Sequence, residues 1–219
     1  MSGMPKLVKP LVVIVIAVAV AAGAAVYLSR QPDEPAGGAS TPIHANIKGG
    51  GHLRGPENAQ VTLVEFGDYQ CPSCGAFHPL VQEVLHRYPT QVRLEFHHFP
   101  LVTVHPNTML ASQAVEAAGD QGKYWEMHDA VFEHQSQWSG SPNPEPIFIT
   151  LATGVGLDIN KFMQGLRSPD VQQRILKDVE RGQAAKVEAT PTFFINGEQL
   201  HVRLSMEDFV QAIESHLHK

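Results

Sequence analysis

Cysteine is scarce in this chain, because its 219 residues include only two, Cys71 and Cys74. Small secreted domains that depend on disulfide bridges have several cysteines at scattered positions, so a disulfide scaffold is excluded. A chain of this length buries enough apolar surface to fold without such bridges. A bridge between positions so close in sequence would constrain the unfolded chain very little. The pair is therefore hard to explain as architecture.

Positive charge is scarce outside the N-terminus. The net charge is −6, and residues 1–30 contain three basic side chains and no acidic one. The remaining residues have 13 basic against 22 acidic side chains and no basic cluster. Nucleic-acid binding therefore has no electrostatic support. The composition, 43% hydrophobic and 17% charged, is typical of one folded domain with an appendage.

Long apolar runs are absent except at residues 11–28, which would form a helix of about 27 Å, close to the thickness of a bilayer core. Lys6 and Lys9 precede this run, so the positive-inside rule predicts a cytoplasmic segment 1–10 and an exported domain. A signal peptide cleaved near residues 22–24 is the alternative. The apolar run continues past that site, which favours an uncleaved single-pass anchor in the cytoplasmic (inner) membrane. Both interpretations place the domain in the periplasm or extracytoplasmic space.

Residues 29–57 are rich in Pro, Gly, Ala and Ser and predict a flexible linker with one short extended piece at 43–47. The globular domain is then expected at 58–219. Residues 61–66 are apolar on both faces, as in a central strand. A helical pattern over 72–88 and an alternating strand pattern from Val92 to Phe96 follow, so the first two strands are predicted to be parallel.

Residues 104–187 are predicted to be helical throughout, with breaks near 120–122, 139–146 and 168–169. After them, Asn196-Gly197 is typical of a type I′ turn between two strands, at 192–195 and 198–204. Ser205 is the expected N-cap of a closing helix over 205–218. The predicted order is strand–helix–strand, a helical insertion, then strand–strand–helix.

Cys71 falls where the first strand's loop becomes a helix. Unpaired backbone N–H groups and the positive end of the helix dipole stabilise a thiolate there, which lowers the thiol pKa. Cys74 lies one turn further, so we expect Cys71 to be the exposed attacking sulfur and Cys74 the shielded resolving sulfur. A zinc site would need two further ligands, and a copper relay or an inert disulfide is also disfavoured.

Glu65 shares a strand face with Val61 and Leu63, where an aliphatic residue is expected. A buried carboxylate there would have a raised pKa and could exchange a proton with the inner thiol, whereas a carboxylate at an exposed strand end would only be solvated. Periodicity does not decide whether Glu65 is buried or solvated. Three histidines, His78, His97 and His98, could tune the thiolate, but packing is the more typical role.

The stretch VTLVEFGDYQCPSCGAFHP at 61–79 resembles the active-site strand and helix of the DsbA-like branch of the thioredoxin superfamily. The resemblance continues through Phe99-Pro100-Leu101, residues 105–132 and residues 190–197, and covers about 55–219. It implies an α/β thioredoxin fold with an inserted helical domain at about 104–187, here preceded by the N-terminal transmembrane helix.

The resemblance also implies roles for single residues. Cys71 matches the nucleophile and Cys74 the resolving cysteine, and Glu65 matches the buried acid beneath the site. Thr190 and Pro191 match the substrate-binding segment, in which the proline is cis, although the general rarity of cis X–Pro bonds argues for trans. Pro79 matches the proline that kinks the active-site helix.

The implied function is that of an exported, membrane-tethered oxidase whose redox centre is the Cys71–Cys74 disulfide, with no other cofactor and no metal. Its partners would be cysteine-containing exported proteins and a membrane protein of the DsbB type that reoxidises it. The strongest oxidants of the branch have His where this chain has Ser73. A reductase or isomerase therefore remains an alternative, and a non-catalytic thioredoxin-fold adaptor or metal relay is a third.

Overall fold

The computed structural model describes residues 47, 49–201 and 205–218. The predicted cytoplasmic segment 1–10, the transmembrane segment 11–28 and most of the predicted linker lie outside the described residues. Within the described ranges, no helix is both long enough and apolar enough to cross a membrane.

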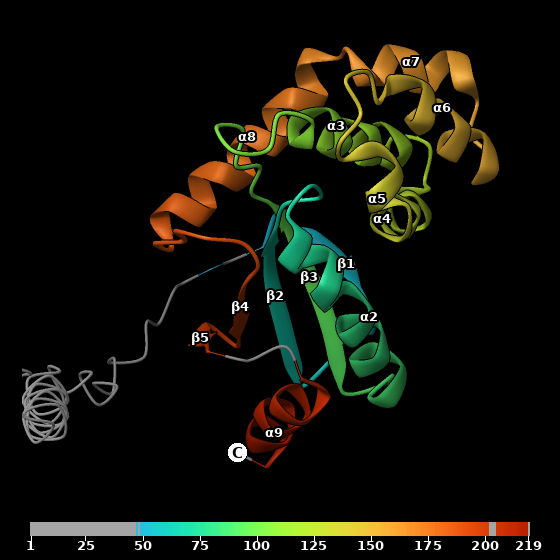
Figure 1. Ribbon diagram of the computed structural model, residues 1–219. Coiled ribbons are helices and arrows are strands. Elements are labelled where there is room, and N and C mark those ends of the chain that lie inside the picture. The colour runs from blue at the N-terminus through green and yellow to red at the C-terminus, as the bar shows by residue number, and fades with distance from the viewer. Residues whose placement is uncertain (1–46, 48, 202–204, 219) are drawn as a thin grey trace, which may run out of the picture. The chain divides into compact units, whose positions relative to one another are not determined.

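A mixed sheet organises the described part of the chain (Figure 1), with its strands in the order β1-β3-β2-β4-β5. The strands β2 and β3 are parallel, as the strand–helix–strand spacing predicts, and the other neighbouring pairs are antiparallel. The bounds are β1 His52–Arg54, β2 Val61–Gly67, β3 Val92–His98, β4 Thr192–Ile195 and β5 Glu198–Leu200.

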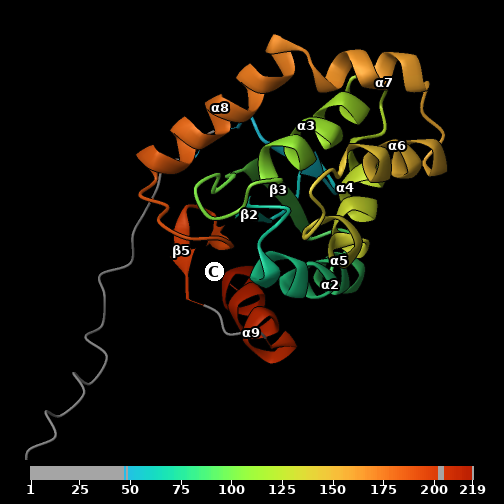
Figure 2. The ribbon, with the colours of Figure 1, turned by 45° about the horizontal axis from the view of Figure 1, so that its top comes forward.

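Strand β2 is central, and both of its faces are buried. Val61 and Leu63 pack with helices α2 (Pro72–Arg87) and α9 (Met206–Leu217), and Phe66 on the other face packs in a cluster that includes α8 (Pro169–Ala184). Figure 2 shows α2 and α9 on one side of the sheet and α8 on the other. Burial on both sides explains why this strand is a nearly continuous apolar run.

Two local predictions at the C-terminal end are confirmed. Asn196 and Gly197 have φ values of +49° and +92°, as a type I′ turn between β4 and β5 requires. The Ser205 side chain accepts a hydrogen bond from the backbone N–H of Asp208 and caps α9.

Between β3 and β4 the described chain is helices and short turns. A separate apolar core joins these helices around Met127, Trp138, Phe148 and Phe162. The predicted breaks occur, and two further ones lie at His134, between α4 and α5, and at Gly156, whose φ of +82° is suited to the end of α6. Besides α8, the helices are α3 Thr108–Gly119, α4 Tyr124–Glu133, α5 Gln135–Trp138, α6 Glu145–Gly154 and α7 Ile159–Leu166.

The prediction of a flexible linker over residues 29–57 is wrong at one place. His52–Arg54, inside this segment, forms strand β1. It pairs antiparallel with β3, at the edge of the sheet. Three residues are too few to give an alternating pattern, and the pairing depends on a partner strand about 40 residues away. Only the assembled sheet makes this segment a strand.

Candidate active site

Cys71 is the N-cap residue of α2, with an extended backbone (φ −66°, ψ 122°), and Pro72 occupies the first helical position. The carbonyl of Cys71 accepts the first hydrogen bond of the helix, from the N–H of Gly75. Proline suits this position because its missing N–H would be unpaired there anyway. Local sequence thus places the sulfur at the start of the helix, although only 7% of Cys71 is exposed, so it is less open than expected.

The surroundings of Cys71 lower the pKa of its thiol to about 5. The largest contribution is a hydrogen bond from the Cys74 thiol, which burial opposes, and the Thr190 side chain and the N–H groups of Cys74 and Ser73 add to the lowering. Cys71 is therefore a thiolate at neutral pH, and a thiolate is the nucleophilic form of cysteine.

Cys74 is fully buried, and its pKa lies well above the usual range. Burial is the main cause, and the hydrogen bond that it donates to Cys71 and the nearby charge of Glu65 act in the same direction. The backbone N–H of Asp68 contacts its sulfur at 3.5 Å. Both cysteines are free thiols in this structure. The site therefore places the acidic thiol of Cys71 next to the thiol of Cys74, which keeps its proton.

Glu65 is on β2 and is 3% exposed, so the structure places it in the interior and not at a solvated strand end. Its pKa is raised to about 8, first by burial and then by the charge on Cys71. Its β-sheet neighbours are Phe96 on β3 and Phe193 on β4. A carboxyl group with this pKa can hold or release a proton near neutral pH.

Thr190 and Pro191 lie beside Cys71, although they are 119 residues further along the chain, because they enter β4 next to β2. The Cys71 sulfur lies 3.3 Å from the Thr190 carbonyl oxygen. The Thr190–Pro191 peptide bond is cis, as the resemblance implies and against the general preference for trans. The structure thus brings together the five residues that the sequence assigns to catalysis and substrate binding, and Pro79 lies within α2 as the resemblance implies.

Asp68 is a buried residue of the site that sequence reasoning missed. Its carboxylate accepts four hydrogen bonds, from the backbone N–H groups of Gln70 and Leu101 and from the side chains of His105 and Thr108. These contacts fix the loop before Cys71 to the segment that follows β3. The only sequence signal is an acidic residue directly after a buried strand.

Two glutamines fix the same loop to the helices between β3 and β4. Gln135 donates to the carbonyl oxygens of Tyr69 and Cys71, at 2.7 and 2.9 Å. Gln70 donates to the Ser139 carbonyl at 2.7 Å and accepts from the N–H of Asn107 at 2.6 Å. The active-site loop is therefore held from both sides, which restricts the positions that Cys71 can take.

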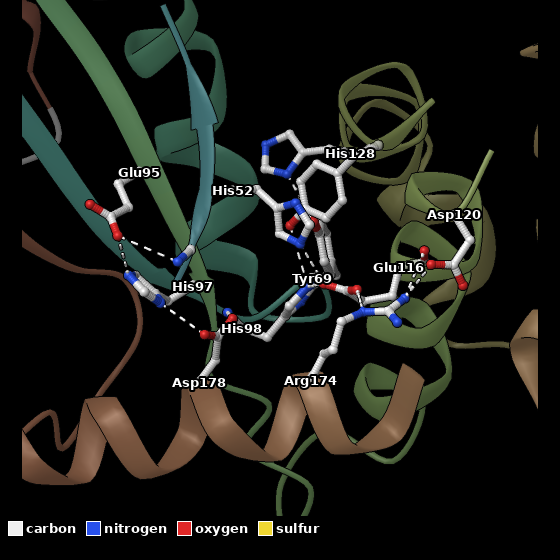
Figure 3. A network of polar contacts seen from close by, with 12 residues as sticks. His52, Tyr69, Glu95, His97, His98, Glu116, Asp120, His128, Arg174 and Asp178 are labelled. Carbon is white, nitrogen blue, oxygen red and sulfur yellow. Dashed lines mark hydrogen bonds and ion pairs between the residues drawn. The ribbon is translucent and has the colours of Figure 1, made fainter. Parts of the chain in front are cut away.

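A buried polar network lies next to this loop (Figure 3). Glu116 on α3 contacts the rings of His52 and His98 at 2.6 and 3.0 Å and the guanidinium of Arg174. Separately, His97 bridges Glu95 and Asp178 at 3.2 and 2.9 Å. Thus His97 and His98 are buried members of this network, which joins β1 and β3 to α3 and α8.

Comparison with known proteins gives the family. Residues 48–215 match the family model described as Thioredoxin, so the chain belongs to the thioredoxin family. Among curated proteins, the chain is 40% identical over 164 residues to Na(+)/H(+) antiporter NhaA 1 of Salinispora arenicola and 38% identical over 164 residues to NhaA 3 of Salinispora tropica. Each match covers 75% of this chain but only 24% of the relative, so the chain spans about a quarter of these relatives' length.

Solved structures with similar folds include BdbD of Bacillus subtilis, at 24% identity with a TM-score of 0.72 over 82% of this chain and 98% of that one. A thioredoxin-like oxidoreductase of Silicibacter pomeroyi is 25% identical with a TM-score of 0.66, covering 78% and 95% of the two chains. Wolbachia pipientis alpha-DsbA1 is 19% identical with a TM-score of 0.68, covering 77% and 92%. The chain is thus a member of the thioredoxin family that shares the fold of these oxidoreductase and DsbA structures.

Proposed function

We propose that the chain is an exported oxidoreductase that forms disulfides in substrate proteins through Cys71 and Cys74. The supporting observation is the contrast between the two thiols, because the pKa of Cys71 is about 5 while that of Cys74 is raised. A stable Cys71 thiolate favours the reduced form of the enzyme. The disulfide form is then a correspondingly stronger oxidant of other thiols.

The reaction begins when a substrate thiolate attacks the sulfur of Cys71 in the Cys71–Cys74 disulfide. The S–S bond breaks, a mixed disulfide forms at Cys71, and Cys74 leaves with the electron pair. The carboxyl group of Glu65 is suited to supply the proton that Cys74 then takes, since its pKa is about 8. A second substrate thiolate attacks the substrate sulfur and releases Cys71 as a thiolate. The substrate is oxidised by two electrons and the cysteine pair is reduced by two.

Substrate binding is assigned to Thr190 and Pro191. The Thr190 carbonyl oxygen lies 3.3 Å from the Cys71 sulfur, so a peptide that pairs with this backbone would bring its own cysteine to the nucleophile. An extended segment can bind in this way without a particular sequence, because the pairing uses backbone groups. This mode suits an enzyme with many substrate proteins.

The proposal places the domain outside the cytoplasm, tethered by a helix over residues 11–28. A membrane protein of the DsbB type would reoxidise the cysteine pair, and no other cofactor would be needed. The apolar run and the lysines that precede it support this arrangement. Antiport is not part of the proposal, because the matches to the antiporter-named relatives cover only about a quarter of those proteins.

A reductase or isomerase is the second candidate, and Ser73 between the cysteines is the observation that favours it. A hydroxyl stabilises the neighbouring thiolate less than an imidazole would. A non-catalytic adaptor or a metal relay is a third candidate. A thiol with a pKa of about 5 gives an adaptor no advantage, and a relay would need both sulfurs as thiolates, whereas the pKa of Cys74 is raised.

The reduction potential of Cys71–Cys74, measured by equilibration with glutathione, separates oxidase from reductase. We expect a value closer to about −120 mV, as in DsbA, than to about −270 mV, as in thioredoxin. A potential close to the thioredoxin value would contradict the oxidase and support a reductase. Release of the full chain from membranes by high salt alone would contradict the uncleaved anchor.

A further inference from the structure

A groove between helices α2 and α4 opens one turn beyond the active-site cysteines. His78, Gln82 and His86 of α2 line it, facing Phe132 and Glu133 of α4. His78 also belongs to a second grouping, because ligand atoms of His78, His128 and Asp129 all lie within 4.8 Å of one another. The proposed thiol chemistry uses none of these three side chains.

The two imidazoles are prepared to bind a metal ion. Burial lowers the pKa of both His78 and His128, so each is neutral near pH 7 and has a lone pair to offer. The Nδ1 atom of His128 contacts the Tyr69 hydroxyl at 2.8 Å, which fixes the ring and leaves Nε2 as the ligand atom. The His78 ring stacks on Phe132 with a centroid distance of 4.9 Å.

Asp129 supplies the third ligand. The Nε2 atom of His78 lies 3.7 Å from Oδ1 of Asp129, which is too long for a hydrogen bond. Metal–nitrogen and metal–oxygen bonds of about 2.0–2.2 Å separate tetrahedral ligands by roughly 3.3–3.6 Å, so this pair needs only a small adjustment. Gln82 donates to the same oxygen at 2.7 Å and would hold the carboxylate in place while it binds the ion.

Arg54 is the cation, among the residues that the structure describes, that competes for this position, since it contacts Oδ1 of Asp129 at 2.9 Å. Its side chain is one-third exposed, and its guanidinium also lies 5.4 Å from the centroid of the Trp125 ring. It can therefore move towards solvent and Trp125 while a metal ion takes over the carboxylate.

A second histidine–carboxylate cluster gives a useful contrast. In it, His52 and His98 already contact one oxygen of Glu116 at 2.6 and 3.0 Å, and Arg174 contacts the other oxygen. Those groups satisfy one another by hydrogen bonds, so a metal ion would have to separate them. Within the described residues His78 has no hydrogen-bond partner, so the groove cluster offers a ligand nitrogen on the same side as its carboxylate that no hydrogen bond engages.

We propose that His78, His128 and Asp129 bind one divalent transition-metal ion of the zinc type, with water from the groove as fourth ligand, and that this ion holds α2 against α4. Two nitrogens and one carboxylate with an open fourth position form a donor set that zinc commonly accepts. The ion would brace the helix that carries both cysteines without using either thiol.

The test uses the full chain with Cys71→Ser and Cys74→Ser, which removes thiolate binding. We expect one Zn²⁺ per chain by calorimetry, a tetrahedral Co²⁺ absorption spectrum, and a Zn²⁺-dependent rise in the melting temperature. Adding His78→Gln or Asp129→Asn should weaken Zn²⁺ binding at least about tenfold and abolish the spectrum. His52→Gln, the matched control in the other cluster, should change neither.

Absence of stoichiometric Zn²⁺ binding in the serine background would overturn the proposal. Equal affinity in the His78→Gln variant, or loss of binding in His52→Gln alone, would overturn it as well. Circular dichroism of each variant without metal checks that it is folded, and His78→Gln, at the edge of the groove, guards against misfolding of Asp129→Asn.

Discussion

Glu65 and Glu116 are both buried, yet their surroundings shift their pKa values in opposite directions. Glu116 lies between two histidines and an arginine, and although burial alone would raise its pKa, contacts with His52 and His98 hold that pKa far below the usual range. Glu65 has no hydrogen-bond or ion-pair partner within the described residues, and its pKa rises to about 8. Their partners, and not their depth, decide whether these carboxylates are charged.

The difference separates two kinds of buried polar group. The network around Glu116 joins β1, β3, α3 and α8, and its charges are used to hold the fold together (Figure 3). Within the described residues no ion pair holds Cys71, Cys74 or Glu65 in one charge state, so their protons can move, and proton movement is what thiol–disulfide exchange requires. Single substitutions in the Glu116 network or in the active site around Cys71 therefore test this comparison.

Replacing the nucleophile should give the largest effect. Cys71→Ser should slow oxidation of a reduced test peptide by on the order of 10³-fold or more, because the hydroxyl cannot form the mixed disulfide. Stopped-flow measurement of peptide oxidation would show this. Cys74→Ser is the control, since its Cys71 thiolate should still attack glutathione disulfide, forming a mixed disulfide at Cys71 and releasing the other glutathione as a thiolate. Exchange at the native rate in Cys71→Ser would support a site outside this cysteine pair.

Glu116→Gln should destabilise the fold by about 2–4 kcal/mol at pH 7, because it removes the buried anion that His52, His98 and Arg174 share, and Arg174 then keeps only Asp120. Urea unfolding measures the change. The control is Glu126→Gln, whose carboxylate forms an exposed pair with Lys123, and which should change stability by no more than about 0.5 kcal/mol. The reactivity of Cys71 in the folded Glu116→Gln variant should be unchanged. An equal loss of stability in Glu116→Gln and Glu126→Gln would show that the network around Glu116 contributes no more than an exposed ion pair.

Glu65→Gln should change the free energy of unfolding in the opposite direction, and stabilise the fold at pH 8 by about 2 kcal/mol. Because the folded-state pKa is about 8 against an ordinary 4.5, the native contribution of Glu65 is fully present below pH 4.5 and is lost as the pH rises towards 8. The neutral amide avoids that loss, so no gain should appear at pH 4. Unfolding curves at both pH values test this, and a gain of equal size at each would contradict the titration.

Ser73→His should give the smallest effect. It adds a charged group next to Cys71 in the active site. A protonated imidazole next to Cys71 should lower the thiolate pKa from about 5 by up to ~1 unit and make the potential less negative by about 30 mV. Ultraviolet absorbance of the thiolate against pH gives the first value and glutathione equilibration the second. The same absorbance change in Cys71→Ser would show that another group is being observed.

Much of the fold follows from patterns within single segments. The apolar run of β2, the helical spacing of α2, the Asn196-Gly197 turn and the Ser205 cap are local signals, and each is found where the sequence predicts it. Strand β1 and the extra helix break at Gly156 were missed, because the first depends on pairing with β3 and the second on one backbone angle.

The features of the active site likewise divide into those that local sequence predicts and those that depend on distant segments. Cys71 at a helix start can be read from its neighbours in sequence, because the helix terminus itself stabilises the thiolate. Whether Glu65 is buried could not be decided from periodicity, since β4 and the helices that cover it come from distant parts of the chain. Asp68 gives almost no signal alone, because the groups that donate to it come from the segment after β3.

The sequence by itself determined the paired thiols, the strand and helix that present them, and the apolar run that predicts an anchor, because each depends on residues within a turn or two of one another. Only the tertiary structure decided which carboxylates stay charged and which imidazoles converge. Those properties depend on which distant segments surround a group, since burial raises the pKa of a carboxyl group and a well-placed cation reverses the shift.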